Sequence, residues 1–257
     1  MTPPPEPSFQ ARSQALLETL RFTGMAACLE AELARAEREG TAVGEVVYRL
    51  LEEEWRVRQE RSLANRISHA KIPWAWTLDS FPFEQQPSVN KTQILGLSDL
   101  HFLQRGENIV FIGPPGTGKT GLAIGLLRKA LLNGYRGRFY NAQDMLDELY
   151  ASLADRSTPR LLKRLSRYDL LVIDELGYLS LKPEQVNAFF KLIEQRYTRK
   201  STVITTNLDY TAWYELFQRK PLVDALLDRI RHQCTTILLD GPSLRIPEQP
   251  SDSGNDG

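Results

Sequence analysis

The sequence is poor in the features that mark secreted or membrane proteins. Its 257 residues include only two cysteines, Cys28 and Cys234, which stand far apart without metal-type spacing, so no disulfide framework is indicated. No apolar run approaches the roughly 20 residues that span a bilayer. The beginning, MTPPPEPSFQ, lacks the basic and then apolar order of a signal peptide. We therefore expect a cytoplasmic protein with reduced thiols and no membrane partner.

An excess of charge of either sign is also missing. The 32 basic and 32 acidic side chains cancel, so the formal net charge is zero. This excludes a basic field over the whole surface, and any nucleic-acid surface must be local. Hydrophobic residues make up 42% of the chain, which is enough for a sizeable core.

Glycine and proline are scarce from residue 9 to residue 70. Only Gly24, Gly40 and Gly44 interrupt this stretch, which is rich in the helix formers Ala, Leu, Glu and Arg. We predict two or three helices, broken near Gly24 and within GTAVG, that form an all-helical domain over residues 9–72.

The character of the chain changes in KIPWAWTLDSFPFEQQPS, which holds three prolines and four aromatic residues. This composition is typical of a linker that packs onto a folded domain, and we expect such a linker over residues 73–96. A second domain is expected over residues 97–247. The Pro-rich residues 1–8 and the polar tail 248–257 are expected to be disordered.

Short apolar strands alternate with helical stretches in this second domain. The strand candidates are residues 108–112, 137–141, 169–174, 201–206 and 234–239. The helices expected between them cover roughly residues 119–132, 143–165, 183–197 and 221–232. Such alternation predicts an α/β fold with a five-stranded parallel sheet flanked by helices.

The octapeptide GPPGTGKT, which begins at residue 113, has the spacing of a phosphate-binding loop. Its glycines let backbone amides approach phosphate oxygens closely, and the helix that begins at Lys119 adds its dipole. Lys119 would reach the terminal phosphates of ATP, while Thr120 would offer a hydroxyl to Mg²⁺. The residues expected to bind the nucleotide here are Gly113, Pro114, Pro115, Gly116, Thr117, Gly118, Lys119, Thr120 and Gly121.

A pair of carboxylates ends the buried strand in DLLVIDE. We expect Asp174 to bind the nucleotide by holding Mg²⁺ through water. Glu175 would orient and activate a water for attack on the γ-phosphate. Kinases of small metabolites do not need this second acid, since their nucleophile is a substrate hydroxyl.

Polar residues near the following elements complete the expected site. Asn207, after the strand that ends in TTN, would hold the attacking water or the γ-phosphate, and its position favours an oligomeric ATPase of the AAA+ class. Arg229 and Arg231 precede the last strand. One of them, with Arg229 favoured, would reach the neighbouring subunit's nucleotide. Arg245 would sense the nucleotide in its own subunit from a short extension after the last strand.

The motifs GPPGTGKT, DLLVIDELGYL, STVITTN, ALLDRI and SLR, in this order, resemble those of the IstB-like insertion-sequence ATPases. The resemblance covers roughly residues 10–247. It implies an AAA+ core that assembles on double-stranded DNA in the presence of ATP, remodels that DNA and assists a transposase. Helicase loaders of the DnaC type share the same core motifs and are the alternative. A P-loop kinase of small molecules is a third possibility, which Glu175, Asn207 and Arg229 disfavour.

Two basic stretches are candidates for DNA contact. On a helix over residues 56–71, one face would gather Arg58, Arg61, Asn65 and His69, opposite Leu63, Ile67 and Ala70. An ordinary solvated helix is the alternative reading of this pattern. The second cluster consists of Lys163, Arg164 and Arg167.

Overall fold

A computed structural model of the chain describes residues 8–177 and 179–245. Of the segments expected to be disordered, residues 1–7 and 248–257 lie outside the described residues. Ser8 is described, and it begins the first helix, because its hydroxyl accepts a hydrogen bond from the amide of Ala11 (3.2 Å). The chain divides into two compact units, the first ending at Asn65 and the second beginning at Arg66.

Three helices account for most of residues 9–70. They are α1 (Phe9–Thr19), α2 (Thr23–Glu39) and α3 (Val43–Ala70). Leu29, Val46 and Leu50 form a small core between them in the first unit. Gly40 ends α2 in the left-handed conformation (φ 65°), which fits the expected break in GTAVG.

The expected break near Gly24 is confirmed, and it falls just before this residue. The chain turns earlier, at Arg21, which has a φ of 60°, and Gly24 lies inside α2. A Cβ on Gly24 would lie 2.8 Å from the Cα of Glu54, so the glycine lets α2 approach α3 closely. The Glu54 carboxylate then accepts hydrogen bonds from the amides of Gly24 (2.7 Å) and Met25 (3.2 Å) and caps α2 from the neighbouring helix.

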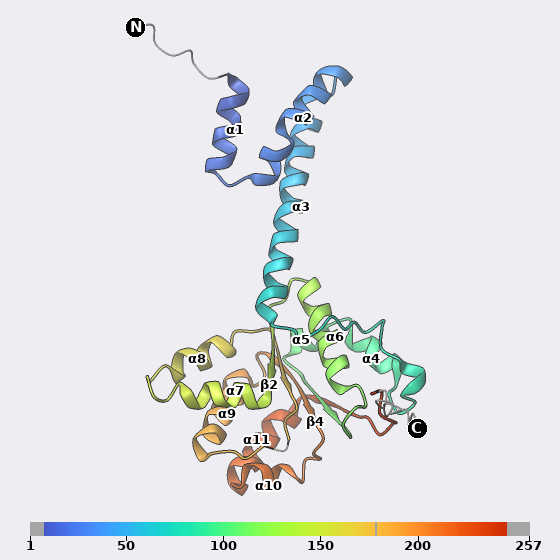
Figure 1. The fold of residues 1–257 in the computed structure, drawn as a ribbon, viewed down its shortest axis with the longest axis vertical. Helices are drawn as coiled ribbons and strands as arrows, with labels where there is room; N and C mark the ends of the chain where they lie inside the picture. Colours follow the sequence, from blue (N-terminus) through green and yellow to red (C-terminus); the bar gives the residue numbers. More distant parts are fainter. Residues whose placement is uncertain (1–7, 178, 246–257) are drawn as a thin grey trace, which may run out of the picture. The chain divides into compact units, whose positions relative to one another are not determined.

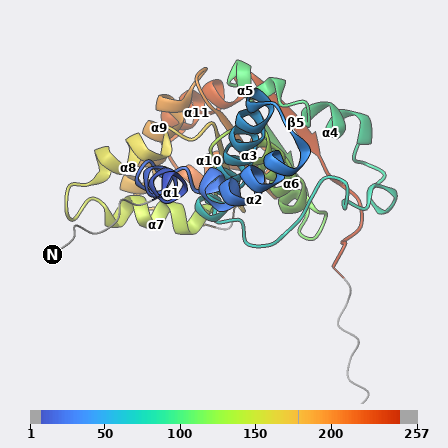
Figure 2. The same cartoon turned by 90° about the horizontal axis from the view of Figure 1, so that it is seen from above.

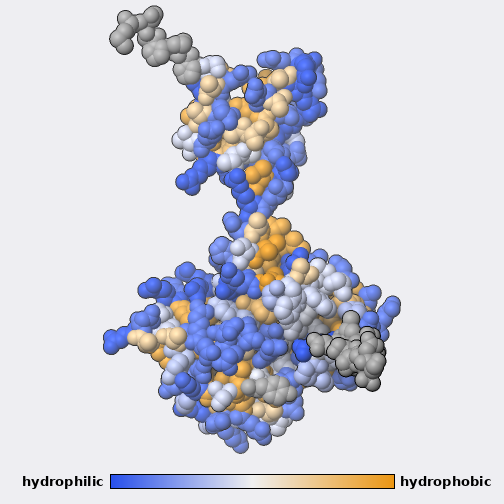
Figure 3. Space-filling model, viewed as in Figure 1, coloured by the Kyte–Doolittle hydropathy of each residue, from blue (hydrophilic) through white to orange (hydrophobic). Residues whose placement is uncertain are grey.

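The first unit also exposes large apolar side chains. Leu16 of α1, Leu20 directly after it, and Val47, Leu51 and Trp55 of α3 are all exposed. Figure 3 shows such apolar surface between polar regions on this unit.

The second unit is built on the predicted five-stranded parallel sheet, with strand order β2-β3-β4-β1-β5. The strands are β1 (Asn108–Ile112), β2 (Gly137–Asn141), β3 (Leu170–Asp174), β4 (Ser201–Thr206) and β5 (Cys234–Leu238). The five sequence-based strands are thus confirmed within one residue. β1, β3 and β4 are buried along their whole length, which explains their near-continuous apolar sequences.

Helices cover both faces of this sheet (Figure 1). Val110, Ile173 and Ile204 point to the face that carries α7 to α11, while Ile109, Val172 and Val203 point to the face of α5 and α6. In Figures 1 and 2, α9 and α11 lie side by side on the first of these faces. The helices of this unit are α4 (Lys91–Leu97), α5 (His101–Arg105), α6 (Lys119–Leu132), α7 (Ala142–Ala151), α8 (Thr158–Leu165), α9 (Pro183–Arg196), α10 (Trp213–Phe217) and α11 (Lys220–His232).

One long helix expected over residues 143–165 is wrong, because two helices, α7 and α8, occupy this stretch. Between them Arg156 takes a left-handed conformation (φ 59°). Pro159 stands in the first turn of α8, where its missing amide costs no hydrogen bond, whereas inside one continuous helix it would break the hydrogen-bond ladder. The short helices α4, α5 and α10 were not expected, since they carry too few turns to show a periodic pattern.

The aromatic segment after α3 packs against the phosphate-binding loop and α6. Leu78, Phe81 and Val89 are buried in the same core as α6. The chain divides after residue 65, before the expected boundary at residue 72. Two contacts support the earlier division. Ala70 is fully buried in the second unit's core, and Arg66 Nε donates to the carbonyl of Leu131 (2.9 Å).

Among the described residues, no helix combines the length and the apolar character that crossing a membrane requires.

Candidate functional site

The loop between β1 and α6 has the geometry of a phosphate-binding cradle. Gly116 and Gly118 take φ values of 84° and 93°, which side-chain-bearing residues rarely adopt. Gly113 lies so close to the residue after β5 that a Cβ would sit 2.0 Å from the carbonyl oxygen of Leu239. The loop ends where α6 begins at Lys119, so the first amides of this helix face the loop.

Lys119 folds back over this loop. Its Nζ donates to the carbonyl oxygens of Gly113 and Pro114, each at 2.7 Å. Burial lowers the pKa of the ammonium, while the negative charges of Asp174 and Glu175 act in the opposite direction. An ammonium in this position can pair with phosphate oxygens.

Asp174 ends β3 almost completely buried, with 4% of its surface exposed. Burial raises the pKa of its carboxyl group, and hydrogen bonds from Thr205 and Thr120 oppose this shift. The Thr205 hydroxyl donates to Asp174 Oδ1 over 2.6 Å. Thr120 and Asp174 together provide oxygen ligands of the kind that Mg²⁺ prefers, and a divalent cation would compensate the buried carboxylate. The residues present therefore fit a magnesium ion.

Glu175 follows in a left-handed conformation, with a φ of 59°. Its amide donates to the hydroxyl of Thr205 (2.9 Å). Its carboxylate accepts a hydrogen bond from Asn141 Nδ2 at the end of β2 (3.0 Å). Sequence reasoning missed Asn141 and Thr205, although each is a polar residue at the carboxyl end of a strand, where parallel sheets gather functional groups.

Asn207 follows β4 and lies against the backbone of the loop after Glu175. A Cβ on Gly177 would lie 2.2 Å from Asn207 Oδ1. Gly177, in the sequence DELGYL, therefore leaves the space in which the Asn207 side chain sits.

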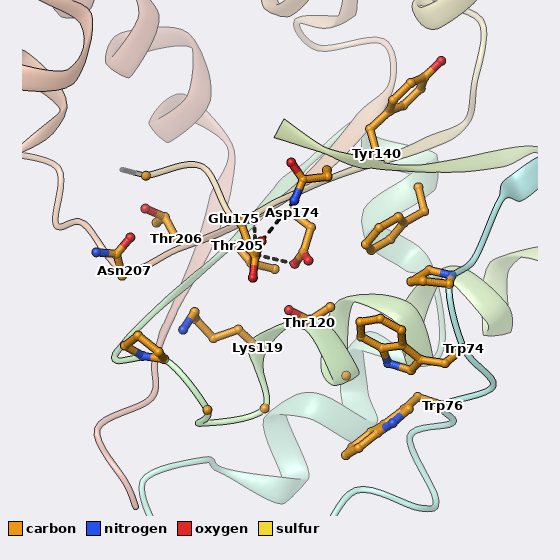
Figure 4. A pocket seen from close by; sticks show the side chains of 18 of the residues that line it. Trp74, Trp76, Lys119, Thr120, Tyr140, Asp174, Glu175, Thr205, Thr206 and Asn207 are labelled. Atoms are coloured by element: carbon orange, nitrogen blue, oxygen red, sulfur yellow. Dashed lines mark hydrogen bonds between the residues drawn. The ribbon is translucent and has the colours of Figure 1, made fainter. Parts of the chain in front are cut away.

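These side chains share one open pocket of about 1210 Å³. In Figure 4, Lys119 and Thr120 lie opposite Asp174 and Glu175. The expected residues that line the pocket are Pro115, Gly116, Gly118, Lys119, Thr120, Gly121, Asp174, Glu175, Asn207 and Arg245. Thr117 instead supports the loop from within, since it is 1% exposed and its hydroxyl donates to the carbonyl of Pro114 (2.9 Å).

Among the described residues, Arg229 and Arg231 lie outside this pocket. Arg229, on α11, is held against α9. Its Nη2 lies 3.4 Å from Glu194 Oε1, and its guanidinium lies 4.9 Å from the centroid of the Phe190 ring. Arg231 lies over the ring of Tyr210, 5.1 Å from its centroid.

The candidate DNA contacts fall in two places. Arg61, Asn65 and His69 are exposed on α3, whereas Arg58 donates to Glu54 (2.6 Å) and so supports the cap of α2. The expected apolar face of this helix is only partly covered, because Ile67 is 39% exposed.

The cluster at α8 forms a basic hollow of about 310 Å³. The residues that line it are Arg136, Arg160, Lys163, Arg164, Arg167 and Tyr168. Arg164 also pairs with Glu148. The fully buried Arg196 donates to the carbonyls of Leu165 and Tyr168, each at 2.9 Å, and thereby fixes the end of α8.

A parallel sheet of this strand order, with a phosphate-binding loop after β1 and an Asp-Glu pair at the end of β3, defines an ATP-binding protein of the AAA+ class. Solved structures share this fold. The crystal structure of the DnaC helicase loader matches with a TM-score of 0.57 and 27% identity, covering 66% of this chain and 99% of that one. The replication initiator DnaA bound to AMPPCP and single-stranded DNA matches with a TM-score of 0.55 and 20% identity, over 66% and 51% of the two chains.

The chain belongs to the family of IstB-like ATP binding proteins, whose model matches residues 15–251. It is 34% identical over 236 residues to the insertion sequence IS21 putative ATP-binding protein of Pseudomonas aeruginosa, covering 92% of this chain and 89% of that protein. It is 38% identical over 204 residues to the insertion sequence IS232 putative ATP-binding protein of Bacillus thuringiensis subsp. berliner, covering 79% and 82%. The resemblance inferred from the motifs is thereby confirmed.

Proposed function

We propose that this protein is a DNA-binding ATPase that assembles on target DNA, remodels it and assists a transposase in DNA transposition. The observation that carries the hydrolytic part is the position of Glu175 beside Asp174, in the pocket that Lys119 also lines. The relatives named for insertion sequences support the role in transposition. The basic hollow at α8 supports DNA binding.

In this proposal the backbone amides of residues 116–121 and the ammonium of Lys119 bind the triphosphate, while Gly113, Pro114 and Pro115 shape the loop. Thr120 and Asp174 hold Mg²⁺, which would neutralise charge on the phosphates. Glu175 accepts a proton from the attacking water. Asn207 orients that water or the γ-phosphate, and Arg245 senses the nucleotide from the same subunit.

The hydrogen bond from Asn141 restrains the catalytic carboxylate in this scheme. While Glu175 accepts from Asn141 Nδ2, one of its carboxylate oxygens is engaged away from an attacking water. The contact limits how far the carboxylate can turn toward the water, so an event that moves the end of β2 would change the rate of turnover.

Arg229 acts on a neighbouring subunit in this proposal, and Arg231 is the alternative. Because Arg229 lies outside its own pocket, it can assist only the nucleotide of another copy. Its pair with Glu194, at 3.4 Å and partly exposed, is weak enough to exchange for a phosphate. Assembly in the presence of ATP would therefore be coupled to hydrolysis.

For DNA, we propose that Lys163, Arg164 and Arg167 contact backbone phosphates, together with the exposed face of Arg58, Arg61, Asn65 and His69. Contacts of this kind position a protein without reading sequence. Affinity for DNA should therefore fall steeply as salt rises.

The test compares Glu175→Gln with Lys119→Ala. Glu175→Gln keeps the shape of the site but loses the proton acceptor, so it should bind ATP normally, release phosphate slowly and accumulate an ATP-dependent complex with double-stranded DNA. Lys119→Ala should lose ATP binding and the complex together. Unchanged phosphate release by Glu175→Gln would show that another group activates the water, and ATP affinity retained by Lys119→Ala would remove the basis of the proposal.

A role as helicase loader is the second candidate, because the DnaC helicase loader matches over 99% of its own chain at 27% identity. Capture experiments with ATP present would separate the two. The proposed transposase partner should bind the purified protein, and a replicative helicase should not. The reverse result would favour the loader.

A further inference from the structure

One end of the pocket is lined by aromatic side chains, and the proposed mechanism assigns no role to them. Its volume of about 1210 Å³ exceeds the range of about 300–1,000 Å³ that is usual for small-ligand sites. Beyond Thr120, the lining residues include Trp74, Trp76 and Phe139. No phosphate chemistry requires aromatic side chains, so this end suits a different part of the ligand.

The two tryptophans differ in how firmly they are held. A Cβ on Gly121 would lie 2.6 Å from Trp76 Cε3, so the Trp76 ring packs directly on the first turn of α6. That ring also meets Phe81 edge-on, with centroids 6.4 Å apart. Trp76 thus belongs to the wall of the pocket. Trp74 is 52% exposed and lines the same pocket.

The phosphate loop fixes the direction in which a nucleotide would lie. The lysine of such a loop reaches the terminal phosphates. In Figure 4, Lys119 and Asn207 lie on one side of Thr120, and Trp74 and Trp76 lie on the other. A triphosphate with its γ-phosphate at Lys119 therefore directs its nucleoside toward the tryptophans.

We propose that Trp74 is the platform on which the nucleobase of ATP stacks. The inference rests on the pocket being the ATP site, and it adds a base-binding residue to it. Every nucleobase has a flat π face, which an indole can cover. An exposed indole gains from being covered, because its apolar surface leaves water. Trp76 keeps the segment in place, so the platform is positioned before the nucleotide arrives.

The test separates the base from the phosphates. Isothermal titration in the presence of Mg²⁺ would measure the affinities for ATP and for inorganic tripolyphosphate. The proteins would be the full-length wild type, Trp74→Ala and Trp74→Phe, with Trp55→Ala as control. Trp55 is 64% exposed and lies on the first unit.

Trp74→Ala should weaken ATP binding roughly tenfold or more and leave tripolyphosphate binding unchanged. Trp74→Phe should recover most of the ATP affinity, and Trp55→Ala should match the wild type. ATP affinity within twofold of the wild type for Trp74→Ala would overturn the proposal, and so would an equal loss for both ligands. Lys119→Ala, measured alongside, distinguishes a failure of the Trp74 proposal from a failure of the phosphate site itself. If it weakens both ligands, the phosphate site stands whatever the outcome at Trp74.

Discussion

At the scale of the residue, Asn141 uses both ends of its side chain. Its Oδ1 accepts a hydrogen bond from the amide of Gln143 (2.9 Å) and so begins α7, while its Nδ2 donates to Glu175 (3.0 Å). The first contact is structural, and in the proposed mechanism the second restrains the carboxylate that activates water. A substitution that keeps an acceptor and removes the donor can separate the two roles.

Asn141→Ser is such a change, since serine also caps helices well. We expect ATP turnover without DNA to rise several-fold, because Glu175 is then free to approach water, while the melting temperature stays close to that of the wild type. Steady-state phosphate release with and without DNA would measure this. Asn133→Ser, at the far end of α6, is the matched control. A fall in turnover would mean that Asn141 assists Glu175 instead of restraining it.

The same residue shows where sequence reasoning stops. Asp174 and Glu175 could be predicted, because a continuous apolar strand leads directly to them. Asn141 could not, because its partner lies 34 positions away. Its position depends on β2 pairing with β3 so that Asn141 stands opposite Asp174. Local sequence patterns carry no signal of that pairing.

At the scale of the element, the close contact between α2 and α3 depends on Gly24, which has no side chain to separate the two helices. The helix break falls just before Gly24, as expected, but Gly24 itself also marks a close approach between two helices. The abundance of helix formers predicted two or three helices over residues 9–70. It could not distinguish a glycine that ends a helix from one that lets a neighbour in, because the difference lies in tertiary packing.

Gly24→Ala should therefore destabilise the first unit. The added Cβ would meet the backbone of α3 at 2.8 Å, and overpacking of this kind typically costs about 1–3 kcal/mol. Gly44→Ala is the matched control, since nothing lies within 4 Å of its added Cβ, and we expect it to be neutral or slightly stabilising. Urea midpoints and amide exchange over α2 would measure both. Equal behaviour of the two variants would contradict the close-approach interpretation.

At the scale of the whole molecule, we expect each ATP site to be completed by an arginine of a second copy. Two mutants can test this, one that lacks the arginine and one that lacks the group that activates water. Arg229→Ala keeps Glu175 and should bind ATP but hydrolyse it poorly. Glu175→Gln keeps Arg229. Each alone should be nearly inactive, and a mixture should recover part of the DNA-stimulated turnover at mixed interfaces. If mixed assemblies form and no activity returns, Arg229 does not act in trans, and Arg231 is tested next.

The aromatic segment before α4 determines where the chain can be truncated without losing the fold of the second unit. A Cβ on Gly118, Gly121 or Gly125 would collide with Phe81, Trp76 or Leu78 respectively, so the start of α6 and residues 76–81 interlock. A fragment that begins at residue 66 should fold and bind ATP, whereas one that begins at residue 97 should be insoluble or lack ATP affinity. Expression of both fragments with ATP titration would check this, and ATP binding by the shorter one would contradict it.

The packing of residues 76–81 on α6 determines where domains could be exchanged between members of the family. The segment between α3 and α4 supplies the side chains that pack against the glycines of α6 and of the loop before it. It is therefore structurally part of the second unit and not of the helices before it. A chimera that joins the first unit of one family member to the ATPase of another should therefore be joined near residue 65. A junction after this segment would separate Gly118, Gly121 and Gly125 from the side chains that pack against them.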